Sequence, residues 1–319
     1  MKILVSGADG FVGRHLNGAL LAAGHSLKLG VRADRGQIDL SGDVEVVGVG
    51  NVGAETDWRG ALDGVDCVIN LVGRAHVLKE DASDPQKAFN DINCHGTLGL
   101  FRAAREMGVQ NFLHLSSVHV LGLQTEEGTA FDDNTIPAPD SDYGRSKLNA
   151  ETGLAALAGD YSGSLVILRP PLIVGAGARG NLERMDRWLK KPILLPFAGI
   201  KNRRTLICVE NLVSAMLAVL NIWQSQSVSG TYLVGDRTPV STTQILQSIK
   251  EGSGGRALLF PLPQFVLTKL LQLAGGEKLV TQLTGNLEVD CQGFQRDFFW
   301  QPQRDTVAGL IAMGQRKHG

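Results

Sequence analysis

The stretch Gly7-Ala8-Asp9-Gly10-Phe11-Val12-Gly13 decides the fold of this chain. It follows an apolar run, Ile3–Ser6, and leads into a pattern of helical period over Phe11–Ala23. Glycines at such a strand-to-helix turn let the backbone approach a pyrophosphate, and the helix N-terminus offers N–H groups and a positive dipole end to the phosphates. The spacing G-x-x-G-x-x-G is one residue longer than the standard dinucleotide fingerprint. We therefore predict a dinucleotide-binding loop rather than a simple tight turn, with contacts from Gly7, Asp9, Gly10, Phe11, Val12 and Gly13.

Short apolar runs alternate with helical patterns through the first half of the chain. This alternation predicts an α/β fold with a doubly wound parallel sheet and right-handed crossovers that place helices on both faces. The predicted strands are Ile3–Ser6, Ser26–Val31, Val44–Val47, Asp66–Leu71, Phe112–Leu115 and Leu165–Leu168. The predicted helices are Phe11–Ala23, Ala88–Met107 and Tyr143–Leu157.

The alternation fades after Leu172, and Thr231–Val234 resembles one more strand. We therefore expect a dinucleotide-binding domain formed by residues 1–172 plus 206–234. A smaller substrate-binding domain would comprise residues 173–205 plus 235–319. Within it, the Leu-rich stretch Phe265–Ala274 predicts a core or interface helix rather than a membrane-surface helix, because it lacks a dense basic face.

Composition narrows the class of protein. The chain has 319 residues, of which 43% are hydrophobic and 20% charged, and its net charge is -1. Such a balance gives no reason to expect nucleic acid or an anionic membrane as a partner. No run of about 18 apolar residues predicts an integral membrane segment, and Met1–Val5 is better explained as a first strand than as a signal peptide. We expect a cytoplasmic protein without a metal site, with four scattered reduced thiols: Cys67, Cys94, Cys208 and Cys291.

The end of the second predicted strand bears on cofactor choice. An NAD enzyme usually places an acid there to bind the adenosine ribose. This chain has Arg32 at that point, which would pair with a 2′-phosphate, and Asp34 two residues further on. We predict a preference for NADP(H), while NAD(H), with Asp34 on the ribose, stays open as the alternative.

Tyr143 and Lys147 form a Y-x-x-x-K pair, which a helix places on one face. Because the unperturbed pKa of tyrosine is about 10, a nearby ammonium that favours tyrosinate would bring that pKa toward neutrality. The Ser117 hydroxyl could then polarise the oxygen that gains or loses the proton. These three residues predict catalytic machinery that interconverts an alcohol and a carbonyl.

The glycine loop, Ser117, Tyr143-x-x-x-Lys147 and Asn93 together resemble the extended short-chain dehydrogenase/reductase family, specifically its NAD-dependent epimerase/dehydratase group, which acts on nucleotide sugars. The resemblance covers essentially the whole chain. It implies a Rossmann sheet with a small C-terminal domain that closes over a nucleotide diphosphate-sugar. Besides the loop, it assigns cofactor contacts to Asn51, Val52, Leu71, Val72, Gly73, Asn93, Tyr143, Lys147 and Pro170.

The same resemblance assigns substrate contacts to Arg74, Ser117, Asn181 and Arg204, the last two to the diphosphate. Arg203 is a weaker second candidate. A guanidinium fork matches phosphate geometry, and a glycine-rich loop can close over the ligand. The family likeness also implies a homodimer through the helices Ala88–Met107 and Tyr143–Leu157.

Two departures from the family pattern bear on the reaction. Nucleotide-sugar 4,6-dehydratases follow the catalytic hydroxyl with an Asp-Glu pair, whereas Ser117 is followed here by Val118 and His119. Glu126 and Glu127 lie too far along the chain to substitute, so 4,6-dehydration is not expected. Leu121 stands where sugar epimerases often carry a tyrosine.

Three segments point to one subgroup of the family. Residues 73–80, 200–206 and 283–290 resemble bacterial reductases of UDP-2-acetamido-2,6-dideoxy-hexos-4-ulose, which make UDP-N-acetylquinovosamine-type sugars for surface polysaccharides. We therefore predict reduction of the C4 ketone of a UDP-linked 4-keto-6-deoxy sugar. A UDP-sugar 4-epimerase with tightly bound NAD, a reductase of a non-nucleotide carbonyl and a non-catalytic NADP sensor remain as alternatives.

The remaining polar candidates carry weaker expectations. His114 ends a predicted strand and should be packed in the core. His76 and His119 lie near the expected site but lack metal-ligand spacing. Asp290 is expected to cap a helix rather than to act as a catalytic acid.

Overall fold

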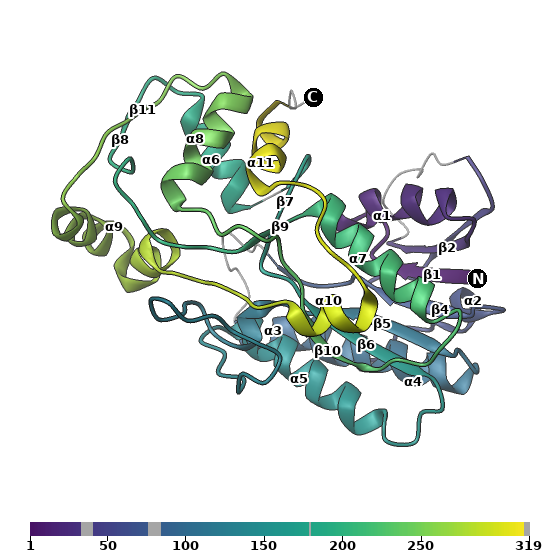
Figure 1. Ribbon diagram of the computed structural model, residues 1–319. Coiled ribbons are helices and arrows are strands. Elements are labelled where there is room, and N and C mark those ends of the chain that lie inside the picture. Colours follow the sequence, from purple (N-terminus) through teal and green to yellow (C-terminus); the bar gives the residue numbers. More distant parts are fainter. Residues whose placement is uncertain (33–40, 76–83, 179, 316–319) are drawn as a thin grey trace.

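The computed structural model describes residues 1–32, 41–75, 84–178 and 180–315, so Asp34 and His76 lie outside the described residues. Its centre is a seven-stranded sheet in the order β10-β6-β5-β4-β1-β2-β3, and all neighbouring strands run parallel (Figure 1). The strands are β1 (Lys2–Ser6), β2 (Ser26–Val31), β3 (Val44–Gly48), β4 (Cys67–Asn70), β5 (Asn111–Leu115), β6 (Ser164–Arg169) and β10 (Gly230–Leu233). The predicted doubly wound parallel sheet is thus confirmed.

Helices cover both faces of this sheet because its strands are apolar on both sides. In β1, Ile3 and Val5 join one buried cluster and Leu4 joins the opposite one. The surrounding helices and turns are α1 (Phe11–Ala22), α2 (Arg59–Leu62), α3 (Pro85–Asn90), η1 (Asp91–Gly96), α4 (Thr97–Glu106), η2 (Val118–Val120), α5 (Asp142–Leu157), α7 (Val209–Ile222) and α10 (Gln292–Phe298). Helices α1 and α7 pack on one side, and α4 and α5 pack against each other.

From β1 the chain adds β2 and β3 on one side and then β4 and the later strands on the other, so the two neighbours of β1 are β2 and β4. In this class of sheet, ligands bind outside the carboxyl ends of the strands at such a switch point. Ser6 at the end of β1 is level with Gly30 of β2 on one side and with Asn70 of β4 on the other. The glycine loop therefore starts at the point where the topology predicts a crevice.

The C-terminal elements gather beyond the carboxyl end of the sheet (Figure 1). They are β7 (Leu172–Val174), α6 (Asn181–Leu189), β8 (Leu194–Leu195), β9 (Leu206–Cys208), α8 (Thr242–Ser253), β11 (Leu258–Leu259), α9 (Gln264–Thr284) and α11 (Thr306–Gln315). A buried cluster joins α6, α8 and α11, whereas Phe294, Phe298 and Trp300 around α10 pack into the core of the main sheet. The division into two domains stays a proposal, and α10 contributes to the first of them.

Three predicted helical features differ from the structure. The predicted helix Ala88–Met107 is divided by the π-helical turn η1, and the helix predicted over Phe265–Ala274 continues to Thr284 across a break at Gly276. Asp290 lies one residue before the N-cap position of α10, which Cys291 occupies. Its Oδ1 nevertheless accepts a hydrogen bond of 2.9 Å from the Gln292 N–H, so the side chain serves the helix start.

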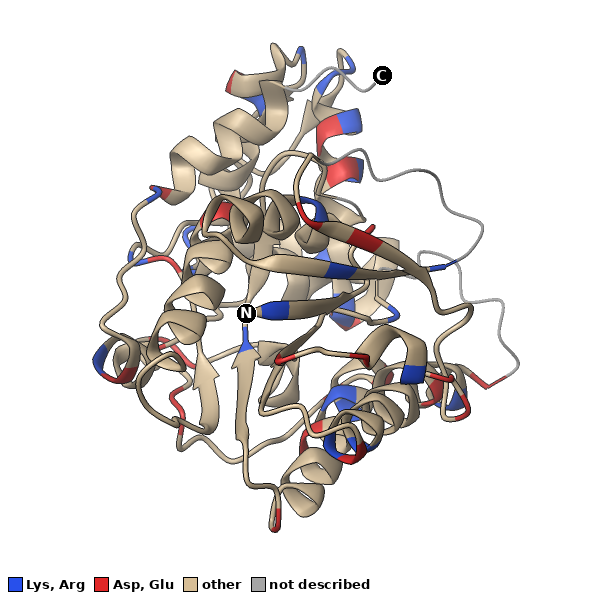
Figure 2. Ribbon diagram, turned by 90° about the vertical axis from the view of Figure 1, so that its right-hand side faces the viewer, with Lys and Arg blue, Asp and Glu red and all other residues tan. Residues whose placement is uncertain are grey.

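Charged side chains of both signs are interspersed along the helices and strands seen in Figure 2. That distribution agrees with the net charge of -1. Among the described residues, no helix is long and apolar enough to cross a membrane.

Candidate active site

The glycine loop has the shape that a bound dinucleotide requires. Gly7 adopts φ +72°, and a Cβ there would lie 3.1 Å from the Val72 nitrogen. A Cβ at Gly13 would lie 2.5 Å from the Ala8 carbonyl oxygen, so only glycine allows α1 to approach the loop this closely. The N–H of Gly10 donates to the Gly7 carbonyl and closes the turn at 3.0 Å. Close approach of strand, loop and helix is the purpose of these glycines in dinucleotide sites.

The N-terminus of α1 is prepared for an anion. Among the described residues, no side chain caps this helix, and its first turn carries no acid. Its first N–H groups and positive dipole end therefore suit a phosphate. These observations fit a dinucleotide cofactor.

A second segment, residues 175–177, lies over the first turns of α1. His15 Nε2 lies 3.0 Å from the Ala176 carbonyl oxygen, and the His15 ring packs edge-on against Phe11 at 5.5 Å. A Cβ at Gly175 would lie 3.7 Å from the tip of Phe11. The predicted loop residue Phe11 is thereby packed beneath a later part of the chain.

The end of β4 forms the floor beside the loop. Ser6 Oγ donates to Asn70 Oδ1 at 2.6 Å, and the Val72 N–H donates to the same oxygen at 3.2 Å. Asn70 Nδ2 in turn donates to Thr97 Oγ1 at 3.1 Å. Leu71 and Val72 therefore lie directly against Gly7, as the sequence predicts for cofactor-side residues.

The π-helical turn brings Asn93 into the site. Asn93 Oδ1 accepts the Arg74 N–H at 2.6 Å, and its Nδ2 donates to the Arg74 carbonyl and to Ser146 Oγ. A Cβ at Gly73 would lie 3.3 Å from Lys147 Nζ and 3.6 Å from Asn93 Oδ1. Asn93 thus fixes residues 73–74 beside α5, through direct bonds rather than through a contact with Lys147. π-helical turns are frequent at functional sites for this kind of local reshaping.

Tyr143 lies in the first turn of α5, held between two rings. Its ring packs edge-on against Phe89 at 6.1 Å and against His119 at 5.8 Å. Arg74 lies over the Phe89 ring, with its guanidinium carbon 5.4 Å from the ring centroid. His119 was a weak sequence candidate, and the structure places it in contact with the predicted catalytic tyrosine.

The titration behaviour of the pair differs from the sequence expectation. Burial raises the pKa of Tyr143, and a hydrogen bond with Ser117 opposes that rise. Burial lowers the pKa of Lys147 from 10.5 to about 8. Lys147 Nζ donates to the Leu115 carbonyl at 2.9 Å. Lys147 is not among the causes of the Tyr143 shift, so the expectation that its charge brings the Tyr143 pKa down is not met in the protein alone, where burial raises that pKa.

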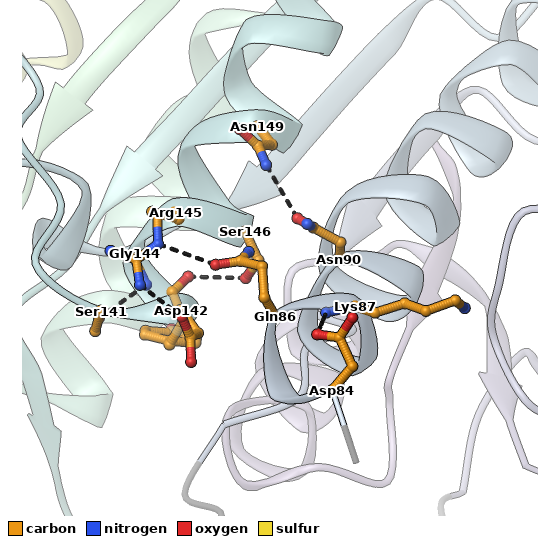
Figure 3. Close-up of polar contacts among 11 residues, drawn as sticks. Asp84, Gln86, Lys87, Asn90, Ser141, Asp142, Gly144, Arg145, Ser146 and Asn149 are labelled. Carbon is orange, nitrogen blue, oxygen red and sulfur yellow. Dashed lines mark hydrogen bonds and ion pairs between the residues drawn. The ribbon is translucent and has the colours of Figure 1, made fainter. Parts of the chain in front are cut away.

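Helix α3 supports the start of α5 from outside (Figure 3). Arg145 Nε donates to Gln86 Oε1 at 2.9 Å, and Asn149 Nδ2 donates to Asn90 Oδ1 at 3.0 Å. Ser141 caps α5 by accepting the Gly144 N–H at 3.0 Å. These bonds fix the turn that carries Tyr143.

Two buried charged residues, Glu151 and Arg169, lie next to the site; the resemblance places Arg169 with Pro170 at the nicotinamide, whereas sequence reasoning did not assign Glu151. Glu151 follows Lys147 by one helical turn, and its carboxylate pairs with Arg169 at 2.6 Å. A search for ionisable residues at every fourth position of α5 would have found Glu151. Arg169 precedes Pro170, whose carbonyl accepts the Val118 N–H at 3.0 Å.

The remaining predicted cofactor residues lie around the rim. Arg32 is exposed at the end of β2, and Asn51 is exposed after β3. Val52 packs close to η1, because a Cβ at Gly96 would lie 2.7 Å from Val52 Cγ1. Cofactor roles for these residues and for Pro170 stay predictions.

The predicted diphosphate residues lie in the C-terminal part. Asn181 is the first residue of α6, directly after Gly180 with φ +75°. Arg204 Nη1 donates to the Gly285 carbonyl at 2.9 Å, and burial lowers its pKa to about 10. Arg203 is engaged by Glu288 at 2.8 Å, which weakens its candidacy as a second phosphate ligand. Substrate roles for Asn181, Arg204 and Arg74 stay predictions.

The carboxylate pair of a 4,6-dehydratase is replaced by packed groups. Val118 is buried, and His119 turns its ring to Tyr143. Leu121 is buried in a small apolar cluster with Val118. His114 is fully buried, as predicted, with Nδ1 3.2 Å from Asn70 Nδ2.

Comparison with known proteins agrees with this arrangement. The family model described as the NAD dependent epimerase/dehydratase family matches residues 3–235. The chain belongs to the NAD dependent epimerase/dehydratase family. It is therefore an enzyme of this family, and the resemblance seen in the sequence is confirmed at that level.

Two relatives and one solved structure are similar to this chain. The UDP-glucose 4-epimerase of Vibrio cholerae is 31% identical over 316 residues, which cover 98% of this chain and 94% of that protein. The GDP-6-deoxy-D-mannose reductase of Pseudomonas aeruginosa is 30% identical over 71% of this chain and 73% of that protein. The solved structure of UDP-glucuronic acid 4-epimerase from Bacillus cereus, in complex with NAD, has a TM-score of 0.77 at 20% identity, covering 98% and 97% of the two chains.

Proposed function

We propose that this epimerase/dehydratase-family enzyme reduces the C4 ketone of a UDP-linked 4-keto-6-deoxy sugar. The observation that carries the proposal is the placement of Ser117, Tyr143 and Lys147 beside a glycine loop shaped for a dinucleotide. These groups suit alcohol–carbonyl interconversion, and the packed side chains after Ser117 leave no acid pair for dehydration.

Each catalytic residue has a role that its surroundings support. Tyr143 donates a proton to the C4 oxygen as general acid, for which its raised pKa keeps the phenol protonated at neutral pH. Ser117 donates a hydrogen bond to the same oxygen as negative charge develops. Lys147 lies near Gly73 and holds the ribose next to the reacting ring, and its charge stabilises the proton relay. The bound nicotinamide supplies the hydride.

The cofactor is held by the glycine loop and the N-terminus of α1, with Asn51, Val52, Leu71, Val72, Gly73, Asn93 and Pro170 around it. We propose NADP(H) as the preferred form, because Arg32 is exposed at the end of β2, where a 2′-phosphate would lie. Binding of NADPH and NADH is compared in wild type and Arg32→Ala. A loss confined to NADPH supports the assignment, whereas unchanged NADPH binding contradicts it.

The substrate diphosphate is assigned to Arg204 and Asn181, with Arg74 nearer the sugar. Arg204 keeps its charge at neutral pH despite burial, and its anchor on Gly285 joins two distant segments of the C-terminal part. Arg204→Met should raise the KM for a UDP-sugar, while Arg203→Met, whose partner is Glu288, serves as the matched control. Equal KM values for wild type and Arg204→Met would favour a non-nucleotide carbonyl substrate.

The reaction is tested by anaerobic mixing of NADPH with a UDP-4-keto-6-deoxy sugar while the reduced-nicotinamide absorbance is followed. Stoichiometric loss of absorbance and a 4-hydroxy product support reduction. Formation of a C4 epimer from UDP-glucose or UDP-N-acetylglucosamine, with no oxidation of NADPH, contradicts it. Turnover of any keto sugar also excludes a non-catalytic NADP sensor.

UDP-sugar 4-epimerisation is the second candidate, because the Vibrio cholerae relative that aligns over almost the whole chain carries that activity in its name. An epimerase keeps one NAD through oxidation and re-reduction, whereas a reductase exchanges its cofactor each turnover. Nucleotide analysis of the purified protein separates them: tightly held NAD favours the epimerase, and an exchangeable NADP site favours the reductase.

We further propose a cytoplasmic homodimer that associates through the α3–α4 and α5 helices. Light scattering of wild type and of a variant with charge-reversed residues on exposed α5 positions tests the association.

A further inference from the structure

Three ionisable residues follow one face of α5 at intervals of four: Tyr143, Lys147 and Glu151. Residues four apart on a helix are neighbours on its surface. The first two belong to the proposed proton relay. Lys147 is 3% exposed and Glu151 is 5% exposed, so both charges lie within the protein rather than in solvent.

The Glu151 carboxylate is held from two strands. Arg169 donates Nη2 to Oε2 at 2.6 Å and Nε to Oε1 at 3.1 Å, a bidentate arrangement from β6. Ser116 Oγ donates to Oε1 from the end of β5. A buried carboxylate engaged by a guanidinium and a hydroxyl is a fixed point for all three elements.

Those two strand ends are the ones that carry the site. Ser116 precedes Ser117, and Arg169 precedes Pro170. The Ser116 N–H donates to the Leu168 carbonyl at 2.8 Å, and the Val118 N–H donates to the Pro170 carbonyl at 3.0 Å. Movement of Arg169 or Ser116 would therefore displace the Ser117 hydroxyl relative to Tyr143.

The same carboxylate acts on Lys147 through its charge. Burial disfavours the ammonium, and Glu151 is the negative group that opposes this effect. From the elements packed around Lys147, β5 contributes His114, whose pKa is held well below its usual value partly by Lys147 itself. β6 contributes Arg169, which forms an ion pair with Glu151. The Arg169 charge also acts on the Asp133 carboxylate.

We propose that Glu151 is a positioning residue for the proposed reaction: it holds a negative charge one helical turn from Lys147 and, through Arg169 and Ser116, fixes the strand ends that carry Ser117 and Pro170. The inference rests on the proposed roles of Tyr143 and Lys147. The Glu151–Arg169 ion pair, which joins α5 to β6, would then also support the reaction.

The test measures the ionisation of Lys147 directly, in the protein without substrate. Lysine labelled with ¹³C at Cε reports its titration by NMR, and Lys147→Arg identifies the signal. Wild-type Lys147 should titrate near pH 8. In Glu151→Gln the midpoint should move to lower pH by about one unit, as expected for loss of a neighbouring opposite charge.

Arg169→Gln is the matched variant, since it breaks the same ion pair but leaves the carboxylate. Its Lys147 midpoint should not move to lower pH. Equal downward movement in both variants would show general loosening and overturn the proposal, as would an unchanged midpoint in folded Glu151→Gln. If Glu151→Gln fails to fold, the double variant Glu151→Gln/Arg169→Gln, which buries no unpaired charge at this position, is compared with Arg169→Gln: its Lys147 midpoint should lie about one unit lower, and equal midpoints would overturn the proposal.

The catalytic consequence is read from the pH profile of kcat/KM for whichever C4 reaction the enzyme performs. The alkaline limb of Glu151→Gln should move with the Lys147 midpoint, which gives about a threefold loss at pH 7.5 and about a tenfold loss above pH 9. A decrease of kcat/KM by the same factor at every pH, with the alkaline limb at its wild-type position, would contradict the electrostatic role. Since the NMR titration needs no turnover, a failure of the proposed reaction remains distinguishable from a failure of this inference.

Discussion

Gly13→Ala tests the most constrained point of the site. A Cβ at this position would lie 2.5 Å from the Ala8 carbonyl oxygen and 2.7 Å from the Gly7 carbonyl oxygen, both on the backbone. Side-chain atoms do not approach a backbone oxygen so closely, so loop and helix must separate by about half an ångström. Overpacking of this kind costs about 1–3 kcal/mol.

The consequence should appear in both stability and cofactor binding. Displacing the loop from the N-terminus of α1 misdirects the N–H groups that would hold the phosphates, and a loss of about 1.4 kcal/mol in binding is a tenfold rise in Kd. We therefore expect a lower free energy of unfolding in urea and at least about tenfold weaker binding of NADPH or NADH, measured by fluorescence titration.

Gly18→Ala is the matched control on the same helix. Gly18 is exposed, and a Cβ there would meet nothing within 4 Å. Alanine in an exposed helix interior stabilises by about 0.5–1 kcal/mol relative to glycine. The control should be more stable than wild type and bind cofactor equally well. Wild-type cofactor affinity in Gly13→Ala would refute the assignment of this loop to the dinucleotide.

Three further changes have distinct signatures. Tyr143→Phe should lower kcat about 10²–10⁴-fold with unchanged cofactor Kd, and activity within tenfold of wild type would show that another group donates the proton. Folding lowers the pKa of Lys147 from 10.5 to about 8, so its charge destabilises the fold below pH 8 and this penalty fades as pH rises to 10.5. The free energy of unfolding of Lys147→Met, measured in urea, should accordingly be about 3 kcal/mol higher than that of wild type at pH 7. A difference of the same size at pH 10.5 would contradict this account. Asp236 is buried and accepts hydrogen bonds from Asn211 and Thr306, so Asp236→Ala should cost about 3 kcal/mol in the same assay while Asp305→Ala, at an exposed helix start, costs less than half as much.

Much of the fold could be predicted because its signals are local. The run that forms β1 is apolar on both faces and is followed by a glycine-rich turn and then α1, so strand, turn and helix can be read from adjacent residues. The glycine loop belongs to the same class of signal. The family resemblance also predicts Leu71 and Val72 beside this loop, and they lie against Gly7 because the carboxyl ends of neighbouring parallel strands meet at one edge of the sheet.

The features that sequence reasoning missed depend on contacts between distant segments. A helical pattern over residues 88–107 gives no hint of a π-helical turn, because the turn is stabilised by bonds from Asn93 to Arg74 and Ser146. The family resemblance favours Arg204 over its neighbour Arg203, but residue type alone does not show why their environments differ. The fold engages Arg203 with Glu288 and anchors the half-buried Arg204 on the Gly285 carbonyl.

The proposed proton relay depends on the charges buried around Tyr143 and Lys147. The spacing of Tyr143 and Lys147 predicts that they share a face, but burial raises the pKa of the phenol and lowers that of the ammonium, so proximity alone does not bring the two together in pKa. A relay buried this deeply needs a negative charge that keeps the lysine protonated, and Glu151 supplies it one turn further along α5. That carboxylate is tolerated in the core because Arg169 pairs with it from another strand. Any C4 reaction at this site that requires charged Lys147 should therefore slow above about pH 8, in either direction of proton transfer.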